Sequence, residues 1–185
     1  MKEISLHILD LMQNSIEAGA SWILLEVNEN EDGFLTFSIT DNGRGMSETM
    51  LKKIRDPFVT TRFTRKVGMG VSFVEMTTKQ SGGNLIVKSK LGEGTFLKAS
   101  YLREHLDRPP LGDIVNTIKV FLVTNLKLHF VMHYYVGKAK FTFDSKNVKK
   151  FLGENIDFSY PEVYSWLDEY LRQEINEVRK AGGQK

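Results

Sequence analysis

Apolar residues at the start of the chain follow the spacing of a helix and then that of strands. Residues 2–18 are apolar nearly all round and end at the break formed by Gly19 and Ala20, which predicts a buried helix. Residues 22–30 and 34–40 have the composition and length of two strands. The turn signal Glu-Asp-Gly at residues 31–33 predicts that these strands form a hairpin.

The next part of the chain alternates between irregular and periodic segments and predicts the rest of an α/β sandwich. Residues 56–70, DPFVTTRFTRKVGMG, have no clean period and are rich in Thr, Gly and basic residues, which predicts a loop. Helices are predicted on either side of this loop, over residues 48–55 and 71–82. Strands are predicted over residues 84–90 and 95–101, and the sandwich ends there.

A change of pattern after the sandwich predicts a linker and a smaller unit. A pair of prolines marks residues 103–113 as the linker. A helical stripe, two alternating strands and a final amphipathic helix then predict a small α+β extension over residues 114–185. The spacing of Ser159 and Glu162 predicts a capping box at the start of the final helix. Residues 1–102 are accordingly predicted to form the first domain.

Composition narrows the classes of protein that this chain can be. Its 185 residues suffice to bury a core, and 41% apolar and 26% charged residues are ordinary for a globular protein. The absence of cysteine excludes disulfides, zinc–thiolate sites and thiol catalysis. A net charge of +2 does not favour nucleic-acid binding, and no apolar run approaches the ~20 residues that span a bilayer. We expect a cytoplasmic protein without nucleic-acid or membrane partners.

A polar stripe interrupts the apolar surface of the first helix. His7, Asp10, Asn14 and Glu17 recur at spacings of three and four and therefore share one face. The side-chain oxygen of Asn14 is a ligand that Mg²⁺ accepts beside phosphate oxygens, and Asp10 could deprotonate a water molecule. Taken alone, the pattern fits better with polar groups that merely satisfy a neighbouring loop.

Two glycine-rich segments offer candidate binding loops. In DNGRGM, Gly43 and Gly45 allow a flat ring to approach the backbone, and Asp41 ends a strand where it could accept a hydrogen bond from an exocyclic amine. In VGMGVS, Gly68 and Gly70 precede a helix whose N-terminal N–H groups could bind an anion. A tight turn and a plain glycine-rich helix start are the structural alternatives.

Taken together, the order and spacing of these segments resemble the GHKL superfamily of gyrase, HSP90, histidine kinases and MutL. DLMQN resembles the N box, DNGRG the G1 box, DPFVTTR the F box, GMGVS the G2 box and GEGTF the last box. The resemblance covers residues 4–101 and implies the Bergerat fold, an α+β two-layer sandwich with helices on one face of a mixed sheet. The P-loop signature G-x-x-x-x-G-K-[ST] is absent from the sequence.

The resemblance also implies roles for individual residues. Asn14 would coordinate Mg²⁺, and Asp41 would bind the adenine amine with help from Thr95. Residues 60–66 would form a lid over the phosphates. The implied nucleotide-binding positions are Asn14, Asp41, Gly43, Gly45, Met46, Thr60, Thr61, Gly68, Met69, Gly70, Val71, Ser72 and Thr95.

Asp10 occupies the position where ATPases of this superfamily usually carry the catalytic Glu, so the resemblance assigns it the role of general base. The expected function is binding of ATP and Mg²⁺ with hydrolysis, or transfer of the γ-phosphate to a partner protein. The alternative is an ATP-gated interaction module with little turnover. The N box is closer to that of MutL and the F box to that of the kinases, so the motifs leave the subfamily open.

Three features outside the boxes bear on partners. HLDRPPL, beginning at His105, resembles the phosphoacceptor box of histidine kinases, although it follows the ATP domain here and could simply be a linker. His129 and His133 lie on a predicted strand, where they are too far apart to share a metal ion. The final amphipathic helix could pack in the core or present a surface for a protein partner or a homodimer.

Overall fold

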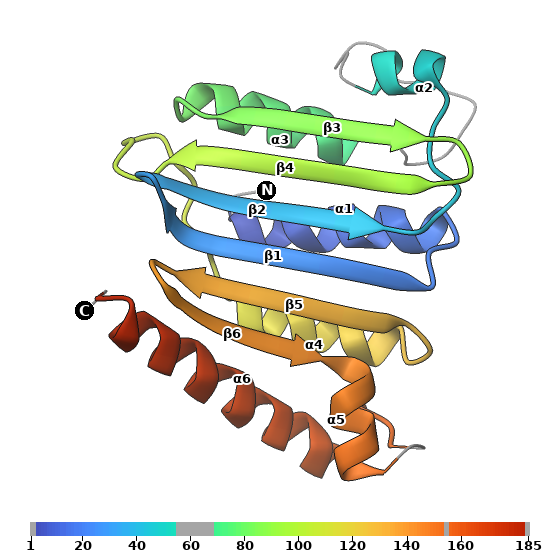
Figure 1. The fold of residues 1–185 in the computed structure, drawn as a ribbon, viewed down its shortest axis with the longest axis vertical. Helices are drawn as coiled ribbons and strands as arrows, with labels where there is room; N and C mark the ends of the chain where they lie inside the picture. Colours follow the sequence, from blue (N-terminus) through green and yellow to red (C-terminus); the bar gives the residue numbers. More distant parts are fainter. Residues whose placement is uncertain (1–2, 55–68, 154–155, 184–185) are drawn as a thin grey trace.

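The computed structural model describes residues 3–54, 69–153 and 156–183, and within them the chain forms one mixed six-stranded sheet (Figure 1). The strands are β1 (Trp22–Glu31), β2 (Phe34–Asp41), β3 (Asn84–Lys90), β4 (Gly94–Leu102), β5 (His129–Val136) and β6 (Ala139–Asp144). Their order across the sheet is β3-β4-β2-β1-β5-β6. The pairing of β1 with β5 is parallel, and the other four pairings are antiparallel.

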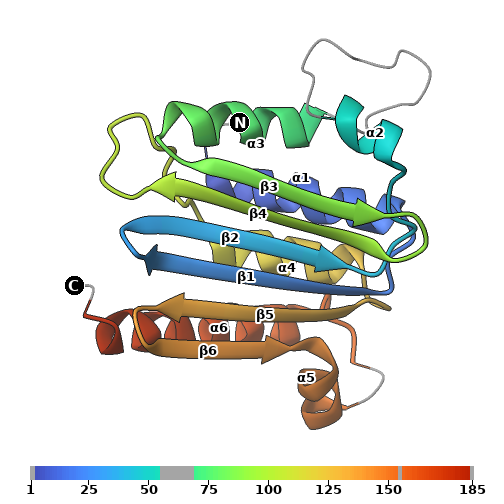
Figure 2. The same cartoon turned by 45° about the horizontal axis from the view of Figure 1, so that its top comes forward.

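Helices cover one face of this sheet. The longer helices are α1 (Ile4–Glu17), α3 (Met69–Gln80), α4 (Ile114–Thr124) and α6 (Pro161–Ala181), and the shorter ones are α2 (Glu48–Lys53) and α5 (Ser145–Leu152). Helix α1 packs between α3 and α4, and α4 packs against α6, so the four longer helices form a continuous layer (Figures 1 and 2). The predicted α+β two-layer sandwich with helices on one face is confirmed.

Alternation along the central strands determines which face is covered. Ile23, Leu25 and Val27 of β1 are fully buried, while the residues between them are partly exposed. Strand β5 repeats this pattern from His129 to Val136. Because successive side chains point to opposite faces of a sheet, the apolar set of each strand faces the helices. The predicted first helix and hairpin are confirmed, and Asp32 and Gly33 provide the positive φ angles of the turn.

The C-terminal segment continues the sheet formed by the N-terminal segment. Strand β5 pairs with β1 along seven residues, from Trp22 opposite His129 to Asn28 opposite Tyr135. The predicted linker also contacts α1, because the first two N–H groups of this helix, from Ile4 and Ser5, donate to the carbonyls of Pro110 and Leu111 at 2.9 and 2.8 Å. The linker therefore satisfies donors that a helix start leaves without partners inside the helix.

Two details of the extension differ from the sequence-based expectation. The predicted capping box is wrong, because α6 begins at Pro161 with Tyr160 as its N-cap residue and without a side-chain cap. Proline suits the first helical position, since it lacks the N–H that would need a partner there. Helix α5 was not predicted, and it begins where the Asp144 side chain accepts from the Lys146 N–H at 2.8 Å.

Deletion of the extension tests the predicted division into a first domain over residues 1–102 and an extension. Removing residues 103–185 would expose the hydrogen-bonding edge of β1, the α4-facing side of α1 and the start of α1. Exposed strand edges favour aggregation, and domain stability is only about 5–15 kcal/mol. We expect residues 1–102 alone to be aggregated or unfolded by circular dichroism and gel filtration. A cooperative, monomeric fragment with the stability of the full chain would show that the first domain is independent.

Candidate functional site

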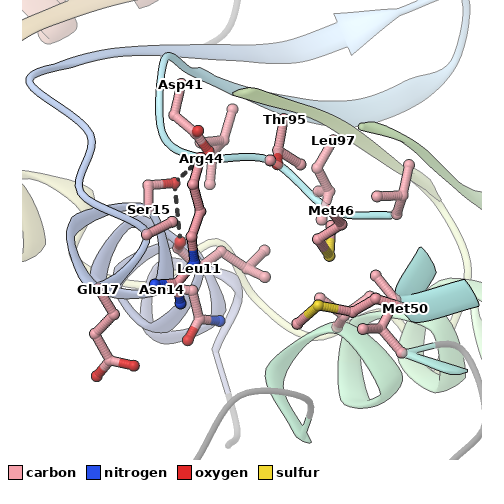
Figure 3. A pocket seen from close by; sticks show the side chains of 16 residues that line it. Leu11, Asn14, Ser15, Glu17, Asp41, Arg44, Met46, Met50, Thr95 and Leu97 are labelled. Carbon is pink, nitrogen blue, oxygen red and sulfur yellow. Dashed lines mark hydrogen bonds between the residues drawn. The ribbon is translucent and has the colours of Figure 1, made fainter. Parts of the chain in front are cut away.

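A cavity lies at the carboxyl end of β2, between α1, the loop after β2, α2 and the start of α3 (Figure 3). Its empty volume is about 760 Å³, which includes the open solvent at its mouth. The cavity is lined by Leu11, Asn14, Ser15, Glu17, Ala18, Ile39, Asp41, Arg44, Gly45, Met46, Met50, Ile54, Val71, Val87, Thr95 and Leu97. Apolar side chains form most of this surface, with a few polar groups among them.

A buried carboxylate lies at the floor of the cavity. Asp41 ends β2, and only 7% of it is exposed. The Ser15 hydroxyl donates to Asp41 Oδ2 at 2.7 Å, and the Gly43 N–H donates to Oδ1 at 2.9 Å. Each carboxylate oxygen can accept more than one hydrogen bond. The floor can therefore accept a further donor from a ligand.

The walls of the cavity differ in chemistry. Figure 3 shows Asn14, Ser15 and Glu17 of α1 on one side and the sulfur atoms of Met46 and Met50 on the other. Thioethers are polarizable and pack well against aromatic rings. A slot with an apolar thioether wall, a polar wall from α1 and an acceptor at its floor suits a flat heteroaromatic ring that carries an amino group.

The glycines of the DNGRGM loop are required by contacts within the chain. Gly45 has a φ of +64°, and a Cβ there would overlap the carbonyl oxygen of Lys90. Asn42 holds the other end of the loop, because its Oδ1 accepts from the N–H groups of Ser21 and Trp22 at 2.9 Å each. The loop therefore contacts the hairpin β3–β4 at one end and the start of β1 at the other. These contacts hold the floor of the cavity in place.

Asp10 lies against the first turn of α3. A Cβ on Gly70 would overlap Asp10 Oδ2 and would lie 3.6 Å from Asn14 Nδ2, so this glycine lets α3 approach both side chains. Burial, and secondarily the charge of Glu17, raises the pKa of the Asp10 carboxyl above its ordinary value. A carboxylate with a raised pKa is a stronger base, and the N-terminus of a helix favours anions. The polar stripe of α1 therefore meets the anion-favouring end of α3.

The structure brings most of the described candidate residues to this cavity. Asn14, Asp41, Gly45, Met46, Val71 and Thr95 line it, and Gly70 touches Asp10 beside it. Gly43 and Ser72 are not lining residues, although Gly43 holds Asp41, and Met69 begins α3. Thr60, Thr61, Gly68 and the predicted lid over residues 60–66 lie outside the described residues.

His7 and His105 do not belong to the cavity. His7 is buried, and within the described part of the chain neither of its ring nitrogens has a hydrogen-bond partner. Burial lowers the pKa of His7 and favours the neutral ring. Leu102 lies seven positions after Thr95 along β4, which separates them by on the order of 20 Å, and His105 follows Leu102. Phosphotransfer to His105 within one chain would therefore need a large rearrangement.

Sequence reasoning missed several residues of the site. The apolar lining from Ile39, Val87 and Leu97 follows from strand alternation once these strands share a sheet. Ser89 gave no signal in the sequence, yet its hydroxyl accepts from the Met46 N–H at 2.9 Å. In the described residues no cluster of three or more His, Cys, Asp or Glu could hold a metal ion. Nor does that part of the chain contain a helix long and apolar enough to span a membrane.

Known sensor kinases are similar to up to about half of this chain. The sensor histidine kinase ZraS of Escherichia coli (strain K12) is 32% identical over 89 residues, which cover 48% of this chain and 19% of the kinase. The sensor kinase CckA of Brucella abortus (strain 2308) is 38% identical over 69 residues, which cover 37% of this chain and 7% of that kinase. The chain therefore spans less than a fifth of the length of these relatives.

A solved structure shares the fold over a longer stretch. The N-terminal domain of a DNA repair protein superposes with a TM-score of 0.53 at 16% identity, covering 77% of this chain and 52% of that one. The family model described as "Histidine kinase-, DNA gyrase B-, and HSP90-like ATPase" matches residues 2–105, more than half of the chain. With the sandwich, the cavity and the ordered motifs in agreement, the chain belongs to the histidine kinase-, gyrase B- and HSP90-like ATPase family.

Proposed function

We propose that this chain binds ATP with Mg²⁺ in the cavity, and that it hydrolyses the nucleotide or transfers its γ-phosphate to a partner protein. One observation carries the proposal. The buried carboxylate of Asp41 forms the floor of a cavity whose wall presents Asn14, next to Asp10 and the start of α3. One space is thus surrounded by a hydrogen-bond acceptor for a base, an oxygen ligand for a metal ion and a helix N-terminus for phosphates.

Recognition of adenine would depend on Asp41. Its carboxylate would accept a hydrogen bond from the exocyclic amine, while the ring would lie between Met46 and the α1 wall. A hydrogen bond to a charged group contributes about 1.5–3 kcal/mol, and more is lost when the buried partner is left unsatisfied. The family match supports ATP as the nucleotide.

The oxygen-bearing side chains of α1 near the start of α3 suit Mg²⁺ only together with a bound nucleotide. Asn14, Asp10 and Glu17 offer hard oxygen atoms on one helix face, and no group of three or more His, Cys, Asp or Glu in the described residues could hold a metal ion by itself. Mg²⁺ is usually held by one or two protein ligands together with phosphates and water. Asn14 would hold the ion, which would neutralise charge on the phosphates when bound.

Asp10 would act as the general base for hydrolysis. Its raised pKa and its place one turn before Asn14 suit the removal of a proton from an attacking water molecule. Its side chain is one methylene shorter than the Glu of related ATPases, and catalysis is sensitive to displacements of about 1 Å. Slow turnover is therefore part of the proposal.

A second candidate function is an ATP-gated interaction module. The observation that favours it is the contact between the linker and α1, because the carbonyls of Pro110 and Leu111 accept from the first N–H groups of the helix that carries Asn14. A shift of α1 on nucleotide binding would reach the extension, which would then present a surface to a protein partner or a second copy in the cytoplasm. Production of ADP or of a phosphorylated partner separates the two candidates.

Substitution of the metal ligand should make binding insensitive to Mg²⁺. We expect Asn14→Ala to weaken binding of Mg·ATP by roughly tenfold or more while barely changing binding of ATP in EDTA, because the lost contact is to the ion. Isothermal titration calorimetry with and without Mg²⁺ measures both values, and Gln13→Ala, an exposed neighbour on α1, is the matched control. Equal losses under both conditions would argue against a metal ligand at Asn14.

Substitution of the base should separate turnover from binding. We expect Asp10→Asn to bind ATP as wild type does and to lose most of its hydrolysis, since general bases contribute roughly 10²–10⁴-fold in rate. Asp10→Glu should keep or raise the rate if the short side chain limits it. Release of ADP is the readout, with Glu169→Gln, an exposed carboxylate on α6 outside the cavity, as the control. Identical ADP release from wild type and Asp10→Asn would remove the base assignment and favour the gated module.

The contact between Gly70 and Asp10 offers an independent test. In Gly70→Ala the new methyl group would overlap the Asp10 carboxylate, which can rotate away because it is the end of a flexible side chain. We expect the fold to persist and kcat to fall by up to about 10²-fold, as a displaced catalytic group predicts. In an Asp10→Asn background the same substitution should add little to the loss of kcat. A Gly70→Ala protein with wild-type kcat would contradict this geometry.

A further inference from the structure

We infer that Ser89 determines which purine the cavity accepts, because it fixes the direction of the Thr95 hydroxyl. Ser89 is a positioning residue in this inference, since it acts on the ligand only through Thr95. The inference rests on the proposed nucleotide function and goes beyond it in naming a specificity determinant.

Three polar side chains lie in one row across the sheet at the floor of the cavity. Ser89 of β3 is opposite Thr95 of β4, and Thr95 is opposite Asp41 of β2. Directly opposite residues have Cβ atoms about 4.5–5.5 Å apart, so neighbouring side chains in such a row can bond. Thr95 and Asp41 line the cavity, whereas Ser89 lies behind Thr95 and is not a lining residue.

Ser89 makes three hydrogen-bond contacts with one hydroxyl. Its Oγ lies 2.9 Å from the Met46 nitrogen, 2.9 Å from the Gly94 carbonyl oxygen and 2.9 Å from Thr95 Oγ1. A serine hydroxyl donates one hydrogen bond and accepts up to two. All of its capacity is therefore used, and the direction of each bond can be worked out.

The proton positions follow by elimination. The Met46 N–H can only donate, and the Gly94 carbonyl can only accept. The single Ser89 proton must therefore go to Gly94, because two oxygen atoms 2.9 Å apart need a proton between them. The remaining contact then requires Thr95 to donate to Ser89. Thr95 consequently presents only acceptor lone pairs to the cavity.

Asp41, like Thr95, offers only hydrogen-bond acceptors to the cavity. The Ser15 hydroxyl and the Gly43 N–H already donate to its carboxylate, and the Ser15 proton is thereby used. The floor formed by Asp41 and Thr95 therefore accepts hydrogen bonds and donates none. Such a floor suits the 6-amino group of a purine and opposes a 6-keto oxygen, which would face acceptors alone.

A bridging water would transmit this polarity. If Asp41 and Thr95 took up its two protons, only its lone pairs would be left for the base. Such a water would accept from an amino group and could not donate to a keto oxygen. The discrimination therefore does not require direct contact between Thr95 and the base.

The test compares ATP with inosine triphosphate, which carries a keto oxygen in place of the amino group. Calorimetric titration gives the ratio of the two Kd values for wild type, for Ser89→Ala and for the control Ser100→Ala. Ser100 lies on the same hairpin, pairs with Asn84 and has no contact with the cavity. We expect wild type and Ser100→Ala to prefer ATP equally. Ser89→Ala frees the Thr95 proton to donate to the keto oxygen and should reduce the preference by roughly tenfold.

A double-mutant cycle distinguishes this role from general support of the loop. Loss of the Met46 contact alone would weaken both nucleotides equally and leave the ratio unchanged, which would overturn the inference. In a Thr95→Val background, Ser89→Ala should no longer change the ratio, because the hydroxyl that it releases is absent.

Two further substitutions of Ser89 extend the test. If Ser89→Ala fails to fold, Ser89→Cys supplies a weaker acceptor and should still lower the ATP preference. Ser89→Thr should retain the preference.

A wild-type chain that binds neither nucleotide would overturn the proposed function, whereas ATP binding with an unchanged ratio in Ser89→Ala would overturn only the role of Ser89.

Discussion

The burial of helix α1 is the constraint on which the rest of the structure depends. Ile4, Ile8 and Met12 are completely buried because α1 packs on the sheet and lies between α3 and α4. A helix in that position cannot carry polar groups without partners except at a high cost in free energy. Asp10 and Asn14 avoid this cost because they face the cavity and the first turn of α3. Within the polar stripe, the buried His7 ring has no hydrogen-bond partner for either nitrogen among the described residues.

The same helix joins the two halves of the chain. Its start is bonded to the linker, its middle packs between α3 and α4, and its last turns form the wall of the cavity. Strand β1, which follows it, pairs with strands from both halves. A movement of α1 at the nucleotide end would therefore be felt at the linker. This connection gives the gated module its physical basis, and it is equally compatible with catalysis.

The sequence predicted those features that local pattern determines. Helical and strand periodicity placed α1, the first hairpin and the amphipathic α6, and the ordered motifs indicated the fold of the family. The parallel pairing of β1 with β5 was not predictable, because no local pattern specifies a partner about a hundred residues away. The roles of Gly45 and Ser89 depend on contacts across the sheet, so they became visible only with the strands in register. The capping-box spacing did not determine where α6 begins, because Pro161 favours the first helical position.

The most direct test of the account is a crystal structure of the chain with Mg²⁺ and a non-hydrolysable ATP analogue. We expect the base between Met46 and the α1 wall, with its amino group bonded to the Asp41 carboxylate directly or through one water. We also expect Mg²⁺ on the side-chain oxygen of Asn14 and the phosphates toward the first turn of α3. A nucleotide bound elsewhere on the chain, or in this cavity with its amino group turned away from Asp41, would contradict the account.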